Sequence, residues 1–171
     1  MITPYLELLS ETSIERTIRL EKMAAGAWRH YWAEEWEPFV AEAARRDEVS
    51  DRVEWTRRWS PEFNLIGVVA EGLYGEITGQ ERLAGFGDGG EDFPGVDVKG
   101  TSHYERPMLL RLASDPLRAE RFCLVAVDLK GHSARYVGYA TREELAAAPE
   151  REYGYGPTRT LTEAQLHKGL P

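Results

Sequence analysis

The stretch from Gly87 to Thr101 constrains this chain most, because a glycine- and aspartate-rich turn runs directly into a strand-like segment. The segment contains the triplet Asp97-Val98-Lys99. Side chains alternate between the two faces of a β-strand, so Asp97 and Lys99 are expected to point the same way. Asp92 precedes the triplet across Pro94-Gly95, a pair that suits a type II turn. The stretch therefore predicts a sheet that gathers two carboxylates and one ammonium group at the start of a strand.

The length and composition indicate one globular domain with room for an added helical segment, since the chain has 171 residues. No apolar run approaches the roughly 20 residues of a membrane helix, and residues 1–10 lack the pattern of a secretory signal. The single cysteine, Cys123, lies in an apolar strand-like run and is expected to be a small buried side chain. We therefore expect a cytoplasmic protein without a membrane partner.

The acidic residues are concentrated around the candidate strand. The net charge is −8, which argues against a strongly basic surface for nucleic acid. Residues 63–99 hold seven acids and two bases, whereas residues 100–171 hold nine acids and ten bases. Bound cations would neutralise part of the local excess. The charge pattern thus predicts a cation site near the Asp-Val-Lys triplet and a nearly neutral surface after it.

The first third of the chain is expected to be helical. Apolar spacing predicts a helix over residues 12–48, with Trp28, Trp32 and Trp36 on one face. We expect these rings to pack against the rest of the domain, with base stacking or a dimer interface as the alternative. Residues 47–62 are highly charged and predict a linker, preceded by a short helix that carries Trp55 and Trp59. The expected organisation is an N-terminal helical segment over residues 1–62 that packs on an α/β core over residues 63–171.

A second helix is predicted over residues 64–79, with Gly79 as its C-terminal cap. Three glycines within it lower the helix propensity and suggest close packing against a sheet: Gly67, Gly72 and Gly75.

The second half of the chain reads mainly as strands. They are expected at residues 96–100, 108–112, 122–129 and 135–140. Thr141 begins a capping box for a helix that ends near Ala148, and a last short helix is expected at residues 162–166 after a loop. This order predicts an α/β fold, with a small mixed central β-sheet flanked by helices and an N-terminal helical segment.

Two motifs resemble those of a known family. Gly67-Val68-Val69-Ala70-Glu71 in the helix and Asp97-Val98-Lys99-Gly100-Thr101 on the strand resemble the phage and bacterial type of the PD-(D/E)xK nuclease superfamily, which has a restriction-endonuclease-like fold. The segment from Tyr136 to Leu145 also looks like the strand-into-helix part of such proteins. The resemblance covers about residues 64–148. The chain departs from the family pattern because Glu91 stands where a proline would precede Asp92, and because the gap to Asp97 is short.

The resemblance implies a metal-dependent nuclease that hydrolyses phosphodiester bonds in DNA with Mg²⁺ or Mn²⁺. Asp92, Asp97, Glu71 and the carbonyl of Val98 would hold the metal, and Lys99 would assist the attacking water. The chemistry is consistent with these residue types, because Mg²⁺ prefers oxygen ligands and keeps several waters. A metal of this kind acts as a Lewis acid and generates a nucleophile.

Several alternatives stay open at the level of sequence. Glu76 lies nearer the apolar stripe of the helix than Glu71, and Asp88 competes with Asp92. The acidic cluster is also compatible with a solvated turn in which Lys99 only pairs with Asp97, a contact that contributes about 0 to 1 kcal/mol. A catalytically inactive binding or assembly module of the same fold is the second functional hypothesis. An RNA substrate and a homodimer are left open as well.

Overall fold

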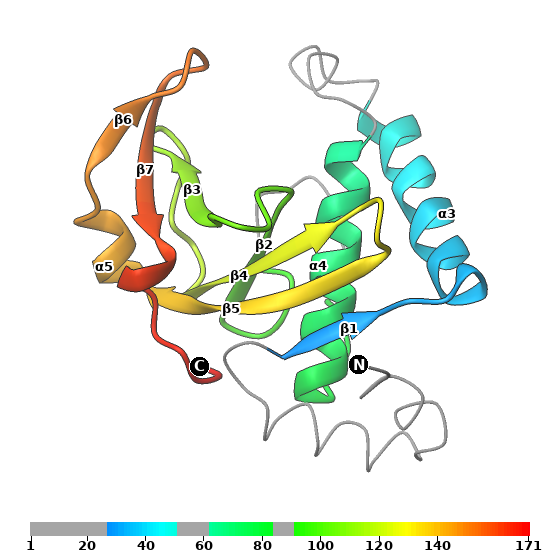
Figure 1. Ribbon diagram of the computed structural model, residues 1–171. Coiled ribbons are helices and arrows are strands. Elements are labelled where there is room, and N and C mark those ends of the chain that lie inside the picture. The colour runs from blue at the N-terminus through cyan, green and yellow to red at the C-terminus, as the bar shows by residue number, and fades with distance from the viewer. Residues whose placement is uncertain (1–26, 51–61, 84–90) are drawn as a thin grey trace.

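The computed structural model describes residues 27–50, 62–83 and 91–171 (Figure 1). In chain order the elements are β1 (Trp28–His30), α3 (Ala33–Ser50), α4 (Glu62–Thr78), β2 (Val96–Thr101), β3 (Met108–Leu112), β4 (Arg121–Asp128), β5 (Ser133–Thr141), α5 (Arg142–Ala146), β6 (Glu150–Glu152), β7 (Pro157–Thr162) and the 3-10 turn η2 (Glu163–Gln165). The predicted short helix with Trp55 and Trp59, and the candidate Asp88, lie outside the described residues.

The strands form two sheets. The central sheet has four strands in the order β1-β5-β4-β2. β2 runs parallel to β4, whereas the β4–β5 and β5–β1 pairs are antiparallel. A second, antiparallel sheet has three strands in the order β3-β7-β6. The predicted mixed central sheet is thus confirmed, and β2, which carries the Asp-Val-Lys triplet, is one of its two edge strands.

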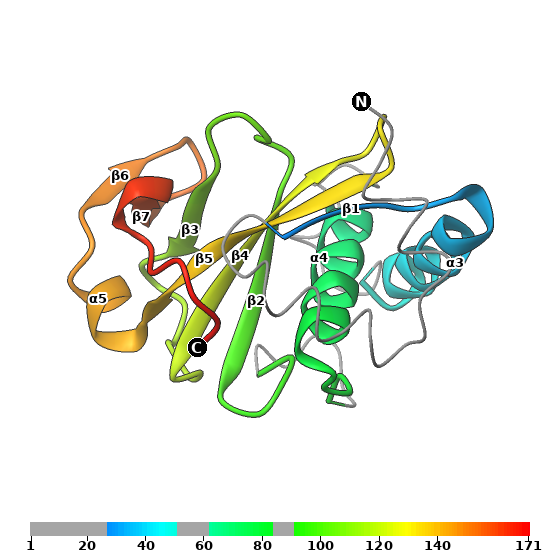
Figure 2. The ribbon, with the colours of Figure 1, turned by 60° about the horizontal axis from the view of Figure 1, so that its bottom comes forward.

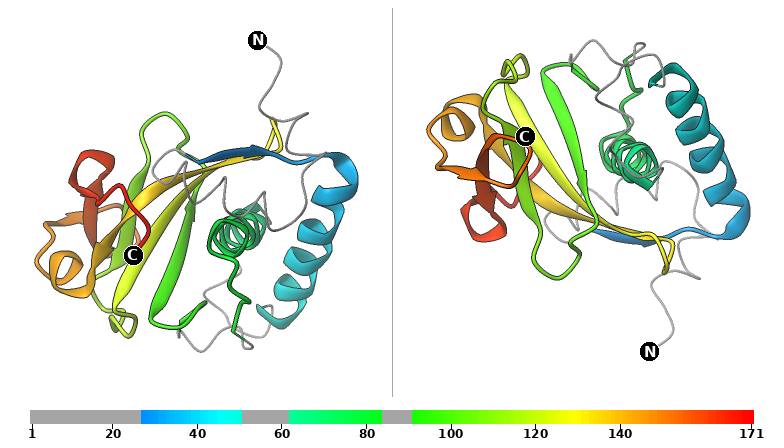
Figure 3. Two further views of the ribbon diagram at one scale, coloured as in Figure 1. Left: turned by 90° about the horizontal axis from the view of Figure 1, so that it is seen from below. Right: turned by 90° about the horizontal axis from the view of Figure 1, so that it is seen from above.

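The two faces of the central sheet are covered differently (Figures 2 and 3). α4 lies on one face with α3 outside it, while the second sheet and α5 lie on the other face. Two core clusters follow from this arrangement. Val98 of β2 belongs to the cluster with Leu73 of α4, whereas Phe122 and Leu124 of β4 belong to the cluster with Leu109 of β3. The prediction of an α/β fold with helices flanking a small mixed sheet is confirmed.

α4 packs tightly on β2 because a glycine of the strand leaves room for it. A Cβ atom on Gly100 would lie 2.6 Å from Cγ2 of Ile66. The glycines of the helix itself were predicted to face the sheet, and this is wrong for Gly72, which faces α3: a Cβ atom there would lie 2.6 Å from the ring of Phe39. At Gly67 a Cβ atom would meet nothing within 4 Å. Gly79 ends the helix at a φ of 68°, as a C-terminal cap requires.

The prediction of a continuous helix over residues 12–48 is wrong within the described part. Residues 28–30 form β1, which pairs with β5, and the helix starts only at Ala33. The tryptophans therefore do not share one helical face: Trp28 is on the strand, Trp32 is 39% exposed and Trp36 is buried. The strand forms here because β5 offers a partner and because the buried Arg29 pairs with Glu35 and Glu76. No helix in the described ranges is long and apolar enough to cross a membrane.

The elements between residues 96 and 150 lie close to their predicted positions. β2, β3, β4 and β5 lie within one or two residues of their predicted positions. The capping box of α5 is formed by Thr141 and Glu144. Residues 150–162 were expected to be largely a loop, but they form β6 and β7. These strands are largely polar, so their formation depends on the pairing of β7 with β3 and of β6 with β7 rather than on an apolar pattern.

Candidate functional site

A tight turn places Asp92 beside β2. The N–H of Val96 donates to the carbonyl of Phe93 at 2.9 Å, and the N–H of Phe93 donates back at 3.0 Å. Gly95 has a φ of 73°, the value that a type II turn needs after proline. The predicted turn is therefore confirmed. It directs the carboxylate of Asp92 to the free edge of β2, where its Oδ2 accepts the N–H of Val98 at 2.8 Å.

Asp97 and Lys99 point to the same face of β2, as their spacing predicts. The Nζ of Lys99 lies 2.7 Å from Oδ1 of Asp97, and the Nη1 of Arg111 on β3 lies 3.3 Å from Oδ2 of the same carboxylate. The side chain of Lys99 is 31% exposed, but that of Asp97 is only 5% exposed. The contact is therefore not the solvated surface pair that the alternative interpretation required.

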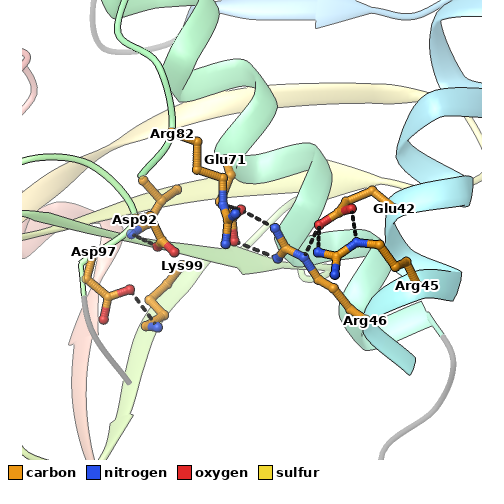
Figure 4. Close-up of polar contacts among 9 residues, drawn as sticks. Glu42, Arg45, Arg46, Glu71, Arg82, Asp92, Asp97 and Lys99 are labelled. Carbon is orange, nitrogen blue, oxygen red and sulfur yellow. Dashed lines mark hydrogen bonds and ion pairs between the residues drawn. The ribbon is translucent and has the colours of Figure 1, made fainter. Parts of the chain in front are cut away.

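Glu71 approaches the same edge from the other side of the strand. Val98 packs towards α4, and its neighbours Asp97 and Lys99 lie on the opposite face of β2, towards the second sheet. Glu71 projects from α4 on the first of these faces. Asp92 lies at the edge between them (Figure 4). The predicted carboxylates thus meet around the free edge of β2 and not on one face of the sheet.

Two arginines hold Glu71 (Figure 4). Arg46 of α3 makes a bidentate contact, with Nη1 2.8 Å from Oε1 and Nη2 2.6 Å from Oε2. Arg82, which follows α4, also pairs with Oε2. Glu76 instead pairs with Arg29 of β1. Of the two candidate glutamates, the structure brings Glu71 to the Asp92 side of the helix and ties Glu76 to β1.

The electrostatics of Asp92 follow from this arrangement. The pKa of Asp92 is raised to about 7, chiefly by burial and then by the negative charges of Glu71 and Asp97. Lys99 and the N–H of Val98 oppose this rise in pKa. The charge of Glu71 acts on Asp92 despite its arginine partners. A cation beside Asp92 would favour the ionised carboxylate.

The free edge of β2 offers three oxygen ligands for such a cation. They are the carboxylates of Asp92 and Asp97 and the carbonyl of Val98. The N–H and C=O groups of one residue in a strand point to the same side, and the N–H of Val98 faces Asp92. Within the three described ranges, no three Asp, Glu, His or Cys side chains are grouped closely enough to bind a metal ion. Glu71 in particular would have to leave Arg46 and Arg82 before it could become a ligand.

A groove opens on the α4 side of the site. It lies between α3 and α4, has a volume of about 770 Å³, and reaches Glu71, Arg46 and Arg82. Arg45 lies beside it and pairs with Glu42 at 2.7 Å. The pKa of Glu42 is lowered to about 2, chiefly by hydrogen bonds from Arg45. The groove therefore combines fixed positive and negative charges next to Glu71.

Sequence reasoning missed the basic residues of the site. Arg46, Arg82 and Arg111 contact the predicted carboxylates, but they lie 25, 11 and 14 residues away along the chain from their partners. Spacing gives no signal for such contacts. The only available hint was that buried carboxylates need partners, which predicts bases near Glu71 and Asp97 without naming them.

Comparison of the chain with protein-family models, with curated proteins and with solved structures finds no match. The resemblance to the PD-(D/E)xK superfamily therefore stays a prediction that depends on the motif residues and on the geometry around β2.

Proposed function

We propose that this protein is a metal-dependent nuclease that hydrolyses phosphodiester bonds in DNA. The observation that carries the proposal is the meeting of Asp92, Asp97 and Lys99 at the free edge of β2, with Glu71 close enough to act on the pKa of Asp92. A carboxyl group with a strongly perturbed pKa, such as that of Asp92, is typical of functional sites when other charged side chains lie close to it. DNA as the substrate is supported by the family resemblance of the two motifs.

The ligand set is consistent with Mg²⁺ or Mn²⁺. Mg²⁺ is usually bound by one or two carboxylates and retains several waters, so it does not need a complete protein cage. Asp92, Asp97 and the carbonyl of Val98 would hold it, and Glu71 would contribute its charge or a contact through water. The bound metal would supply Lewis-acid chemistry and lower the pKa of a bound water.

The side chains of the chain itself have distinct roles in this proposal. Lys99 carries a partly exposed ammonium group that can steady the negative charge developing on a phosphate. Asp97 fixes the position of that ammonium group through the 2.7 Å contact. Arg46 and Arg82 hold Glu71, so the negative field at Asp92 comes from a carboxylate with a fixed position.

One observation favours a catalytically inactive binding module instead. Four basic side chains already pair with the two buried carboxylates: Arg46, Arg82, Lys99 and Arg111. A site neutralised in this way is stable without a metal ion. The two functions can be distinguished by metal binding, because only the nuclease requires Mg²⁺ to bind at Asp92 and Asp97.

The test is cleavage of single-stranded DNA, duplex DNA and RNA with Mg²⁺ or Mn²⁺. Wild type is compared with Lys99→Ala and Asp97→Ala, and with Lys130→Ala as the control, since Lys130 is an exposed lysine next to β4. The proposal expects activity in wild type and the control only. Equal activity in all four proteins, or none in any, would discard it, and cleavage of RNA alone would replace the substrate.

A further inference from the structure

Two arginines lie side by side on the second sheet, next to the candidate site. Arg111 of β3 and Arg159 of β7 are direct partners in the antiparallel register. Arg111 is two residues from Leu109 and Arg159 is two residues from Leu161, so each arginine shares a strand face with its leucine. Both leucines belong to the core cluster between the two sheets. The arginines therefore point towards the face of the central sheet that carries Asp97 and Lys99.

The contacts of Arg111 tie this pair to the site. Its Nη1 lies 3.3 Å from Oδ2 of Asp97, its Nη2 donates to the carbonyl of Pro116 at 3.4 Å, and its Nε lies 3.4 Å from Oδ2 of Asp115. The Arg111 side chain is only 11% exposed. Arg111 thus links the second sheet to the buried carboxylate of β2.

Arg159 is less well satisfied. Its Nη1 donates to the carbonyl of Leu112 at 3.5 Å, and no acid within the described ranges forms an ion pair with it. Its neighbour across β6 is Glu150, whose side chain is exposed. The Nε of Arg159 is buried without a hydrogen-bond acceptor among the described residues. The Nε of Arg111 is buried too, and its 3.4 Å ion-pair contact with Asp115 lacks hydrogen-bond geometry.

Asp97 and Asp115 already neutralise Arg111, so the cost of the arrangement falls mainly on Arg159. Like charges directly opposite each other on adjacent strands are destabilising, and a buried donor without an acceptor adds to that cost. Arginine is well suited to phosphate because its planar fork can donate two hydrogen bonds at once. An anion between the two guanidinium groups would reduce the repulsion between their charges and would accept a hydrogen bond from the buried donor.

We propose that Arg111 and Arg159 form a phosphate-binding pair that holds the nucleic-acid backbone beside Asp97 and Lys99. This inference rests on the proposed nuclease function and names the part of the molecule that binds its substrate. The second sheet then has a specific role, because β3 and β7 present the two arginines at adjacent positions. The site accordingly spans both sheets: β2 carries the reacting groups and the β3–β7 pair carries the backbone contact.

Arg159→Gln tests the pair without unpairing Asp97. The matched control is Arg151→Gln on β6, which removes the same charge from the same sheet. Arg151 is exposed and pairs in register with Thr158, so it lies on the opposite face from Arg159. Arg159→Lys keeps the charge but loses the fork. Thermal unfolding followed by circular dichroism establishes that each variant is folded before its binding is compared.

Binding is measured by the fluorescence anisotropy of a fluorescein-labelled DNA duplex and of the corresponding single strand, over a range of salt concentrations. Ca²⁺ replaces Mg²⁺, and a gel verifies that the probe stays intact. We expect Arg159→Gln to bind about tenfold more weakly than wild type and to reduce the slope of log K against log salt by about one. Arg159→Lys should lie between these two proteins, and Arg151→Gln should match wild type.

The failures of the two proposals can be told apart. If wild type cleaves DNA and Arg159→Gln binds and cleaves as wild type does, the arginine pair is overturned and the nuclease stands. If DNA binding depends on Arg159 but no protein cleaves DNA, the pair is supported and the nuclease is overturned. Equal losses in Arg159→Gln and Arg151→Gln would show a general charge effect and would also overturn the pair.

Discussion

Lys99 and Asp97 lie two residues apart on β2, and the Nζ of Lys99 is 2.7 Å from Oδ1 of Asp97. The carboxylate is buried and is held on its other oxygen by Arg111, so it provides a fixed anchor for a partly exposed ammonium group. A lysine held in this way has one preferred position at the edge of the sheet. The geometry therefore connects a local sequence pattern to a defined position for the ammonium group, which in the proposed nuclease would lie beside the reacting phosphate.

Replacing Lys99 should reduce catalysis more than substrate binding. If the ammonium group assists proton transfer or stabilises charge in the transition state, Lys99→Ala should lower kcat by about 10²- to 10⁴-fold. The KM for DNA should change much less, because Arg111 and Arg159 contact the DNA backbone in the proposed complex. Steady-state cleavage of a labelled duplex measures both constants. A change in KM with an unaltered kcat would assign Lys99 to binding alone.

Mg²⁺ should stabilise the folded protein through Asp92 and Asp97. A ligand that binds only the folded state adds about 2.7 kcal/mol to the free energy of unfolding at about 100 times its Kd. We expect Tm to rise with Mg²⁺ concentration in wild type and to change little in Asp92→Asn. Glu163→Gln, a change on η2 away from the site, serves as the control and should behave as wild type. An unchanged Tm in wild type would favour the inactive module.

The raised pKa of Asp92 predicts a specific pH dependence of stability. The folded state keeps the proton up to about pH 7, whereas the unfolded carboxyl group loses it near its ordinary value of 3.8. Between these pH values the folded state binds more protons, so this group makes the free energy of unfolding fall as pH rises from about 4 to about 7. Urea titrations of wild type and Asp92→Asn without metal should differ in this slope. Parallel pH profiles would contradict the assignment.

Two adjacent arginines should differ strongly in their effect on stability. Arg46 is buried and makes two hydrogen bonds to Glu71, so Arg46→Ala leaves this buried carboxylate with Arg82 as its remaining partner and should cost about 1 to 3 kcal/mol. Arg45 is exposed and pairs only with Glu42 among the described residues, so Arg45→Ala should change little. The free energy of unfolding from urea titration checks both variants. Equal effects would mean that the Arg46–Glu71 contact does not stabilise the fold.

The approach of α4 to β2 predicts opposite effects at two glycines. Gly100→Ala should destabilise the protein by about 1 to 3 kcal/mol, because the new Cβ would lie 2.6 Å from Cγ2 and 2.7 Å from the carbonyl oxygen of Ile66. Gly67→Ala meets nothing within 4 Å and should stabilise α4 by up to about 1 kcal/mol. Thermal unfolding of the two variants measures the difference. A neutral Gly100→Ala would show that the helix can move away from the strand.

The features that the sequence alone determined are local ones. The alternation of a strand placed Asp97 and Lys99 together, Pro94-Gly95 defined the turn before β2, and Thr141 with Glu144 defined the start of α5. Each depends on residues that are neighbours in the chain. Backbone geometry and nearest-neighbour hydrogen bonds are enough to fix such features, whatever the rest of the fold does.

Only the tertiary structure decided which distant groups complete the site. Glu71 and Glu76 lie on the same helix, but Glu71 pairs with Arg46 of α3 whereas Glu76 pairs with Arg29 of β1. β1 itself replaced part of a predicted helix because β5 provided a strand to pair with. The polar β7 likewise required β3 as a partner, and with it came Arg159. Contacts between residues far apart in the chain depend on packing and on charge pairing in the folded state, and these leave no periodic signal in the sequence.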